Sequence, residues 1–275
     1  MSGKNYYYLV AGLPDLILEQ SKVPASLGEF RQELREHLTP AHNRLVDLFF
    51  LPTDNQNVFN LLLNPEAGFD KSGQFPLEYL EEQLVSPSGL PVYLSRFIEA
   101  VRNNTPAIPG LSWEDQLWAL YYDFALSAGN SFVASWFSFE RNIRNLLAGL
   151  IARHYKLDVK EFLIGNDPIT AAIQKSNARD FGLAAELPYV EKVVQIFDIQ
   201  GLTHREKALD NLRWNYIDEL NTFNYFSIEV IIGYVLKLQM ASRWLSLDAA
   251  TGADLFRRIL NDLENSYEFP KEFKK

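Results

Sequence analysis

Two carboxylates within apolar helical stretches are the residues of this sequence whose setting could support chemistry. Glu140 lies on the same helical stripe as Trp136 and Ile143, and Glu229 is surrounded by isoleucine and valine. Burying an unpaired carboxylate is costly, so each one requires a partner arginine or a raised pKa. Two such groups can act as a catalytic acid and base, but structural ion pairs between helices use the same pattern more often. We therefore interpret Glu140 and Glu229 as structural buried carboxylates.

The local sequence offers a partner to only one of these carboxylates. Arg144 follows Glu140 by four residues, which is the order and spacing that favour an ion pair along a helix. Gly233 takes that position after Glu229, so its partner must come from elsewhere. An all-α hydrolase built on paired carboxylates is the less favoured alternative, because no aspartate-rich cluster or adjacent His-Asp pair accompanies the two glutamates.

Motifs for metal, nucleotide and acyl-transfer chemistry are absent from the sequence. The four histidines are scattered: His37, His42, His154 and His204. Pro40 is expected to place the first two in different helices. Lys71 and Ser72 lack the glycine spacing of a phosphate-binding loop. The chain has no cysteine, which excludes disulfides and thiolate zinc sites. We expect no catalytic residue, no metal and no cofactor.

Composition indicates a folded, acidic protein. Hydrophobic residues make up 47% of the chain and aromatic residues 13%, and the formal net charge is −9. No cluster of basic residues offsets this charge, so we expect no nucleic-acid partner. The apolar stretch over 228–245 is interrupted by Glu229, Lys237 and Arg243, whereas a spanning helix needs about 20 mostly apolar residues. We expect a buried core helix there, and no transmembrane segment.

Helical periodicity extends through almost the whole chain and predicts an all-α fold. Apolar residues recur every three or four positions over 131–155, which predicts one long amphipathic helix. No hairpin turn and no sustained alternation indicates a strand. Turn-forming residues predict breaks between helices at 64–76, 86–91, 103–110, 164–168 and 182–188.

Capping residues predict where several helices begin and end. Thr39 before Pro40 is typical of a helix start, and Ser112 with Asp115 forms an approximate capping box. Asp248 is interpreted as the cap of a separate last helix. Gly12 and Pro14 should end the first helix near Ala11.

A weak internal repeat suggests three helical units. The phrases "NVFNLL" at Asn57 and "NIRNLL" at Asn142 are 85 residues apart, and "FSFERNI" at Phe137 and "FSIEVII" at Phe226 are 89 residues apart. Both spacings are close to a third of the chain. We therefore predict three units, at residues 1–88, 89–185 and 186–275, which form a funnel-like scaffold.

Two phrases of the sequence resemble a known family. The tyrosine-rich "YYYLVAG" at Tyr6 to Gly12 and "ERNIRNLL" at Glu140 to Leu147 resemble the C subunit of V-type (vacuolar and archaeal-type) ATPases, which corresponds to the d subunit of the eukaryotic enzyme. More narrowly, the chain resembles a bacterial family encoded among V-type ATPase genes. The sequence departs from the C-subunit pattern at "GLPDL", where that pattern has an arginine-rich stretch.

The resemblance implies a non-catalytic subunit of the central stalk. Such a subunit is a socket that links the rotating stalk subunits (D and F-like) to the membrane proteolipid ring, and it is a peripheral protein at the cytoplasmic face of the plasma membrane. On this basis Arg141 and Arg144 are candidate partner contacts, and Tyr7 and Tyr8 are candidate inter-unit or partner contacts. A helical adaptor with an unrelated partner remains an alternative.

Overall fold

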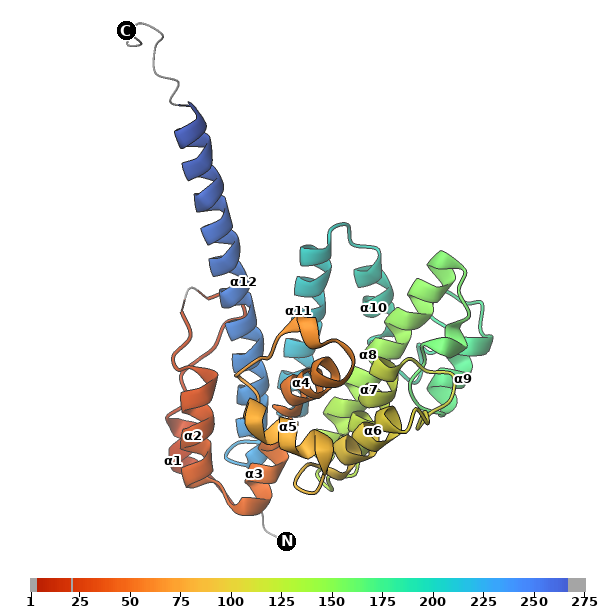
Figure 1. Ribbon diagram of the computed structural model, residues 1–275, viewed down its shortest axis with the longest axis horizontal. Coiled ribbons are helices and arrows are strands. Elements are labelled where there is room, and N and C mark those ends of the chain that lie inside the picture. Colours follow the sequence, from red (N-terminus) through yellow and green to blue (C-terminus); the bar gives the residue numbers. More distant parts are fainter. Residues whose placement is uncertain (1–3, 21, 267–275) are drawn as a thin grey trace, which may run out of the picture.

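The fold is all-α, as predicted from the sequence. The computed structural model describes residues 4–20 and 22–266, with side chains up to residue 248. Within these residues the regular structure consists of twelve α-helices and two short 3₁₀ turns (Figure 1).

The first four helices begin and end largely where local sequence signals place them. Their bounds are α1 Tyr7–Ala11, α2 Leu27–His37, α3 Pro40–Asp47 and α4 Leu51–Leu63. Helix α1 ends at Ala11, as predicted, and the amide of the following Gly12 donates to carbonyls of the preceding turn. The Thr39 hydroxyl accepts from the amide of His42 at the start of α3. This start separates His37 and His42 into two helices, also as predicted.

The middle of the chain alternates short and long helices. The bounds are η1 Pro65–Ala67, α5 Leu77–Val85, α6 Val92–Arg102, α7 Trp113–Leu126, α8 Ser131–Tyr155, η2 Val159–Glu161 and α9 Pro168–Lys175. Helix α8 is the long amphipathic helix predicted over 131–155, and the Ser112 side chain caps α7 by accepting from the Asp115 amide. The predicted breaks fall between these helices.

The last three helices are α10 Val190–Phe197, α11 Leu202–Leu220 and α12 Ile228–Ser266. The prediction of a separate helix capped by Asp248 is wrong, because α12 continues through this residue. No proline or glycine interrupts the sequence just before Asp248. An amide inside a continuous helix already has a carbonyl four residues back, so it needs no side-chain cap.

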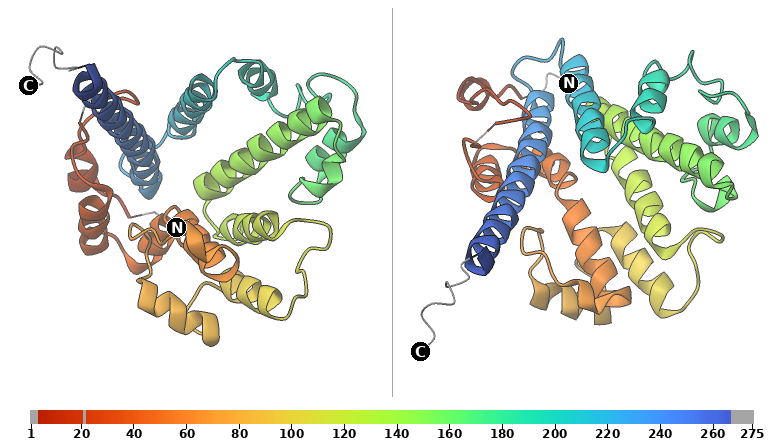
Figure 2. Two further views of the ribbon diagram at one scale, coloured as in Figure 1. Left: turned by 45° about the horizontal axis from the view of Figure 1, so that its top comes forward. Right: turned by 90° about the horizontal axis from the view of Figure 1, so that it is seen from above.

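The helices follow one another around a ring that closes on itself (Figure 2). Helix α12 returns to the start of the chain and packs against α2 and α3, and the Tyr6 amide donates to the Phe226 carbonyl just before α12. The second half of α12 extends away from the other helices (Figure 1). A single hydrophobic core runs through the whole ring, with α4 packed on α6 and α8 on α10. The predicted units are therefore packed together, and their boundaries remain a prediction.

The repeated asparagine phrase has a common structural role in two helices. Its second asparagine is buried in both cases and donates to a backbone carbonyl of the following loop. In α4 this bond joins Asn60 to the Gly68 oxygen at 3.2 Å, and in α8 it joins Asn145 to the Ile164 oxygen at 2.8 Å. The Ile164 amide also donates back to Asn145 at 2.9 Å. These bonds fix the loops relative to the helices.

Candidate functional site

A concave, aromatic-rich surface lies where five helices meet in the ring. We call it the aromatic cleft. It has a volume of about 300 Å³. Helices α4, α7, α8, α11 and α12 supply its walls together with the segment before α4. Its lining residues are Phe49, Pro52, Trp118, Tyr121, Tyr122, Trp136, Phe137, Glu140, Asp210, Arg213, Leu236, Gln239, Met240 and Arg243.

The aromatic side chains of this cleft hold one another in fixed orientations. Tyr121 meets the Phe137 ring edge-on at a centroid distance of 5.4 Å, and its hydroxyl donates to the Leu48 carbonyl at 2.8 Å. Trp118 packs against both Tyr121 and Tyr122. Burial raises the pKa of Tyr121 and Tyr122 well above the usual range. Both phenols therefore stay neutral, and their surface is apolar at physiological pH.

Four charged side chains form a network at the polar end of the cleft. Arg213 donates to both carboxylate oxygens of Glu140, at 2.8 and 3.2 Å, and to Asp210 at 3.1 Å. Arg243 forms a second ion pair with Asp210, and the Trp244 indole donates to the same carboxylate at 2.8 Å. Asp210 is only 1% exposed. The network joins α8, α11 and α12.

The network neutralises its own charges, which bears on what chemistry the cleft can do. Burial disfavours the charged form of Arg213, but Glu140 and Asp210 more than offset this and raise its pKa above the ordinary value. Both oxygens of the Glu140 carboxylate already accept charge-assisted hydrogen bonds from Arg213. The cleft is therefore suited to binding through apolar contact and not to acid-base chemistry.

The prediction that Glu140 forms an ion pair with Arg144 on the same helix is wrong. The Glu140 carboxylate binds Arg213, 73 residues further along the chain. Arg144 instead pairs with Asp115 at 2.5 Å and lies over the Trp118 ring. Glu140 thereby reaches a partly buried partner that holds α8 against α11, which a surface pair on one helix cannot do.

Arg141 and Arg144 are both engaged within the chain. Arg141 pairs at 2.7 Å with Asp167, the residue that caps α9, and its side chain is 17% exposed. Asp115, the partner of Arg144, lies in the first turn of α7. Each arginine therefore connects α8 to the first turn or cap of another helix. Their assignment as partner contacts stays a prediction, and their structural contacts are intramolecular.

The expectation of an arginine or a raised pKa at Glu229 is wrong. This side chain is partly buried at the start of α12, and it accepts a hydrogen bond of 2.8 Å from Asn130, the cap of α8. Burial alone would raise the pKa of Glu229, but polar groups around the carboxylate, including the Asn130 amide, lower it below the ordinary value. A neutral amide is a sufficient partner here because the carboxylate keeps some contact with solvent.

The three N-terminal tyrosines face different surroundings. Tyr6 is buried, and its hydroxyl lies 2.5 Å from Nδ1 of His42. Tyr7 is largely exposed and packs on Phe226 with ring centroids 4.7 Å apart, and Tyr8 is 89% exposed. Tyr7 thus connects the first and third predicted units. We call Tyr7, its contact Phe226 and the two other exposed aromatic residues of the α11–α12 loop the aromatic edge: Tyr7, Phe223, Tyr225 and Phe226.

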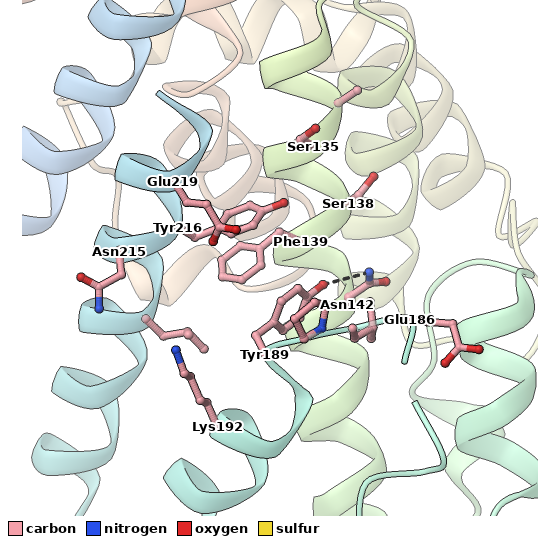
Figure 3. Close-up of a pocket in the computed structure, with 14 residues that line it drawn as sticks. Ser135, Ser138, Phe139, Asn142, Glu186, Tyr189, Lys192, Asn215, Tyr216 and Glu219 are labelled. Atoms are coloured by element: carbon pink, nitrogen blue, oxygen red, sulfur yellow. Dashed lines mark hydrogen bonds between the residues drawn. The ribbon is translucent and has the colours of Figure 1, made fainter. Parts of the chain in front are cut away.

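A second concave surface lies between α8, α10 and α11 and has a volume of about 560 Å³ (Figure 3). The Phe139 ring stacks on the Tyr216 ring with centroids 3.9 Å apart, and it meets the Tyr189 ring edge-on with centroids 4.8 Å apart. Burial raises the pKa of Tyr189 to about 12, although the Asn142 amide contact lowers it. Glu186 and Lys192 lie at the margins of this ring cluster (Figure 3). This groove involves fewer elements than the aromatic cleft, and its rings are already stacked on one another.

Neither a metal cluster nor a membrane span is found in the described part of the chain. No group of three or more histidine, aspartate or glutamate side chains in that part is arranged to hold a metal ion. None of the helices searched there combines the length and the apolar character needed to cross a bilayer.

Comparison with known protein families assigns the chain to one family. Residues 3–267 match the family described as "Protein of unknown function (DUF2764)". The chain belongs to this family. Searches of the curated proteins and of the solved structures give no match.

In this DUF2764 protein, two fully buried carboxylates were missed by sequence reasoning. They are Asp54 and Asp210, both at most 1% exposed, whereas Glu140 and Glu229 are only partly buried. Asp54 lies among polar residues of α4 in "PTDNQN", so nothing in its neighbourhood marks it as buried. A signal existed for Asp210: it precedes Arg213 by three residues on one helix, which is a spacing for an ion pair.

Proposed function

We propose that this protein is a non-catalytic socket subunit of a V-type rotary ATPase, which links the central stalk to the membrane proteolipid ring. The observation that carries the proposal is the aromatic cleft, where helices of all three predicted units meet around one concave apolar surface. A socket must combine such a surface with a rigid frame, and the Arg213 network supplies cross-links between the walls.

The size of the aromatic cleft indicates how the partner is held. An α-helix with its side chains is about 10–12 Å across, so a cavity of about 300 Å³ does not enclose a whole helix. It accommodates one or two large apolar side chains at the end of a stalk helix. Aromatic pockets that receive such anchors supply most of the binding free energy at protein interfaces.

The aromatic edge gives the socket a second contact surface. Phe223 is 86% exposed and Tyr225 is 68% exposed, although both are large aromatic residues. Exposed aromatic side chains are enriched where proteins bind one another. In the proposed arrangement the cleft receives the stalk subunits (D and F-like), and the aromatic edge faces the proteolipid ring at the cytoplasmic face of the plasma membrane.

The test uses one substitution that charges the cleft without disturbing the fold. Pro52 lies in the first turn of α4 and lines the cleft, and a carboxylate is favourable at a helix start. Pro52→Glu should therefore leave the protein folded and abolish its co-purification with the ATPase stalk from native membranes. Pro65→Glu, at the exposed start of η1, is the matched control and should co-purify normally.

The same experiment separates the alternatives. Loss of a partner other than rotary-ATPase subunits in the Pro52→Glu variant would identify a helical adaptor with a different function. A hydrolase that uses Glu140 should lose activity in the Glu140→Gln variant. The bidentate Arg213 contact weighs against that role, because it already occupies both oxygens of the Glu140 carboxylate.

A further inference from the structure

A third cavity, distinct from the groove between α8, α10 and α11, adjoins the aromatic cleft and has a different chemical character. It has a volume of about 1090 Å³ and lies between α2, the start of α4, the loop after η1 and α12. Four basic side chains line it, Arg31, Arg35, Lys71 and Arg243, and Asp70 is the one carboxylate of the lining. The three arginines also contact carboxylates that are not part of the lining: Asp47 pairs with Arg31 and Arg35, and Asp210 pairs with Arg243. We call this cavity the basic pocket.

The loop that carries Lys71 is held in place by buried polar groups of α4. Asp54 accepts from the amides of Gln74 and Phe75, at 2.8 and 3.1 Å. Asn57 accepts from the Asp70 amide and donates to the Asp70 carbonyl, at 2.9 and 2.8 Å. These four bonds hold the loop in one shape against α4, while the second oxygen of the Asp54 carboxylate has no partner among the described residues.

Close backbone approach fixes the same loop further. A Cβ atom at Gly73 would lie 2.6 Å from the Asp54 carboxylate, so only glycine fits between the loop and α4. Gln74 extends from the next position and accepts from Arg31 at 2.6 Å. The loop thus connects a buried carboxylate of α4 to a cation of α2, and it presents Lys71 and Ser72 to the basic pocket.

Several hydrogen-bond donors of the pocket wall are left without partners. Arg31 pairs with Asp47 at 2.8 Å through one terminal nitrogen, but its buried Nε has no partner among the described residues. The buried hydroxyl of Ser242 on α12 is also unpartnered there. Lys71 forms no ion pair with any residue that the structure describes. Unpaired buried donors are rare in folded proteins, and a bound acceptor satisfies them.

We propose that the basic pocket binds a free small molecule that carries two or more phosphate groups. Its cations are spread over α2, the loop and α12, so they can contact several phosphates at once, and the unpartnered Ser242 hydroxyl adds a neutral donor. Small-molecule pockets commonly measure about 300–1,000 Å³, and the volume of this cavity lies just above that range. The proposal does not depend on the socket function.

The experiment is calorimetric titration of the full-length protein with pyrophosphate and with inorganic phosphate. Pyrophosphate should bind at least about tenfold more tightly, because a second phosphate adds further charge-assisted hydrogen bonds. Lys71→Gln and Arg35→Gln should each weaken pyrophosphate binding by about tenfold. Both side chains are exposed enough for the variants to fold, which circular dichroism verifies.

The control is Lys160→Gln, which removes an exposed lysine of η2 outside the pocket and should leave the affinity unchanged. Equal affinity for phosphate and pyrophosphate would overturn the proposal, as would equal losses in the pocket variants and the control. A third titration uses vesicles that contain phosphatidylglycerol. Pocket-dependent binding to these vesicles without binding of pyrophosphate would overturn the free ligand in favour of a membrane surface.

Discussion

The aromatic cleft and the basic pocket share four lining residues, Phe49, Pro52, Gln239 and Arg243. They differ in how far their charged side chains are paired within the chain. In the cleft, Arg213 is matched by Glu140 and Asp210, and what remains accessible is largely apolar. In the pocket, the three arginines have carboxylate partners, but Lys71 forms no ion pair with a described residue and some buried donors have no partner. Adjacent surfaces of one fold are therefore suited to different ligands.

The degree of burial of the charged side chains explains why those of the cleft are paired and those of the pocket are not all paired. Asp210 is fully buried, and a buried charge must be paired because it has lost its hydration. Arg35 is 56% exposed, so solvent stabilises its charge without a full partner. The cleft is accordingly a packed structural element with a binding surface, whereas the pocket keeps charge that a ligand can use.

The largest effect should come from breaking the matched charges of the cleft. Arg213→Met leaves the Glu140 carboxylate partly buried without its arginine and removes one partner of Asp210. We expect the free energy of unfolding to fall by about 3–5 kcal/mol, measured by urea denaturation. The double variant Arg213→Met with Glu140→Gln should recover part of this loss. If the single and double variants are equally unstable, the carboxylate of Glu140 is not the cause.

The second prediction concerns the buried carboxylate behind the pocket loop. Burial raises the pKa of Asp54 to about 6, although the amides of Phe75 and Gln74 lower it. The folded protein then holds this proton more tightly than the unfolded chain. Its stabilising effect is complete below pH 4 and is lost as the pH rises through 6.

Asp54→Asn removes this titration while keeping an oxygen that can accept from the loop amides. The variant should therefore gain stability relative to the natural protein between pH 4 and pH 7.5, by about 3 kcal/mol. Urea unfolding at both pH values measures the difference. An unchanged stability difference at the two pH values would show that folding does not raise the pKa of Asp54.

A smaller effect is expected at the arginines that connect α8 to other helices. The Arg141–Asp167 pair is mostly but not fully buried, so Arg141→Gln should cost about 1 kcal/mol in unfolding free energy. The exposed Arg179–Asp198 pair is the control, and Arg179→Gln should change stability little. Equal costs would mean that burial does not separate structural pairs from surface pairs in this fold.

The smallest effect on stability is expected at the aromatic edge. Tyr7→Ser should change the free energy of unfolding by about 0.5 kcal/mol or less, because the side chain is mostly exposed. The proposed ring contact predicts weaker association with membranes that carry the proteolipid ring. Ile17→Ser alters another exposed apolar residue outside this edge and serves as the control. Sedimentation with such membranes compares the two variants.

Local sequence signals predicted the helices well because their causes are local. Thr39 begins α3 through a hydrogen bond to an amide three residues on, and Gly12 ends α1 within one turn. The same reasoning failed at Asp248, where a capping residue type occurs inside a continuous helix. A cap functions only where the preceding backbone is not helical, and residue type alone does not establish this.

The candidate site was harder to predict because its contacts are long-range. Glu140 was recognised as a carboxylate at the edge of a buried face, but its partner Arg213 is 73 residues away. A single sequence contains no information on which of its 26 basic residues will meet it. The nearby Arg144 fitted the helical spacing and was chosen, but it pairs with Asp115.

The most direct test of the central claim is purification of the rotary ATPase from native membranes that contain either the natural protein or the Pro52→Glu variant. The socket proposal predicts that the natural protein co-purifies with head, stalk and proteolipid ring, and that the variant is absent while Pro65→Glu is retained. An ATPase that purifies without this chain, and that couples hydrolysis to ion transport normally when its gene is deleted, would contradict the proposal.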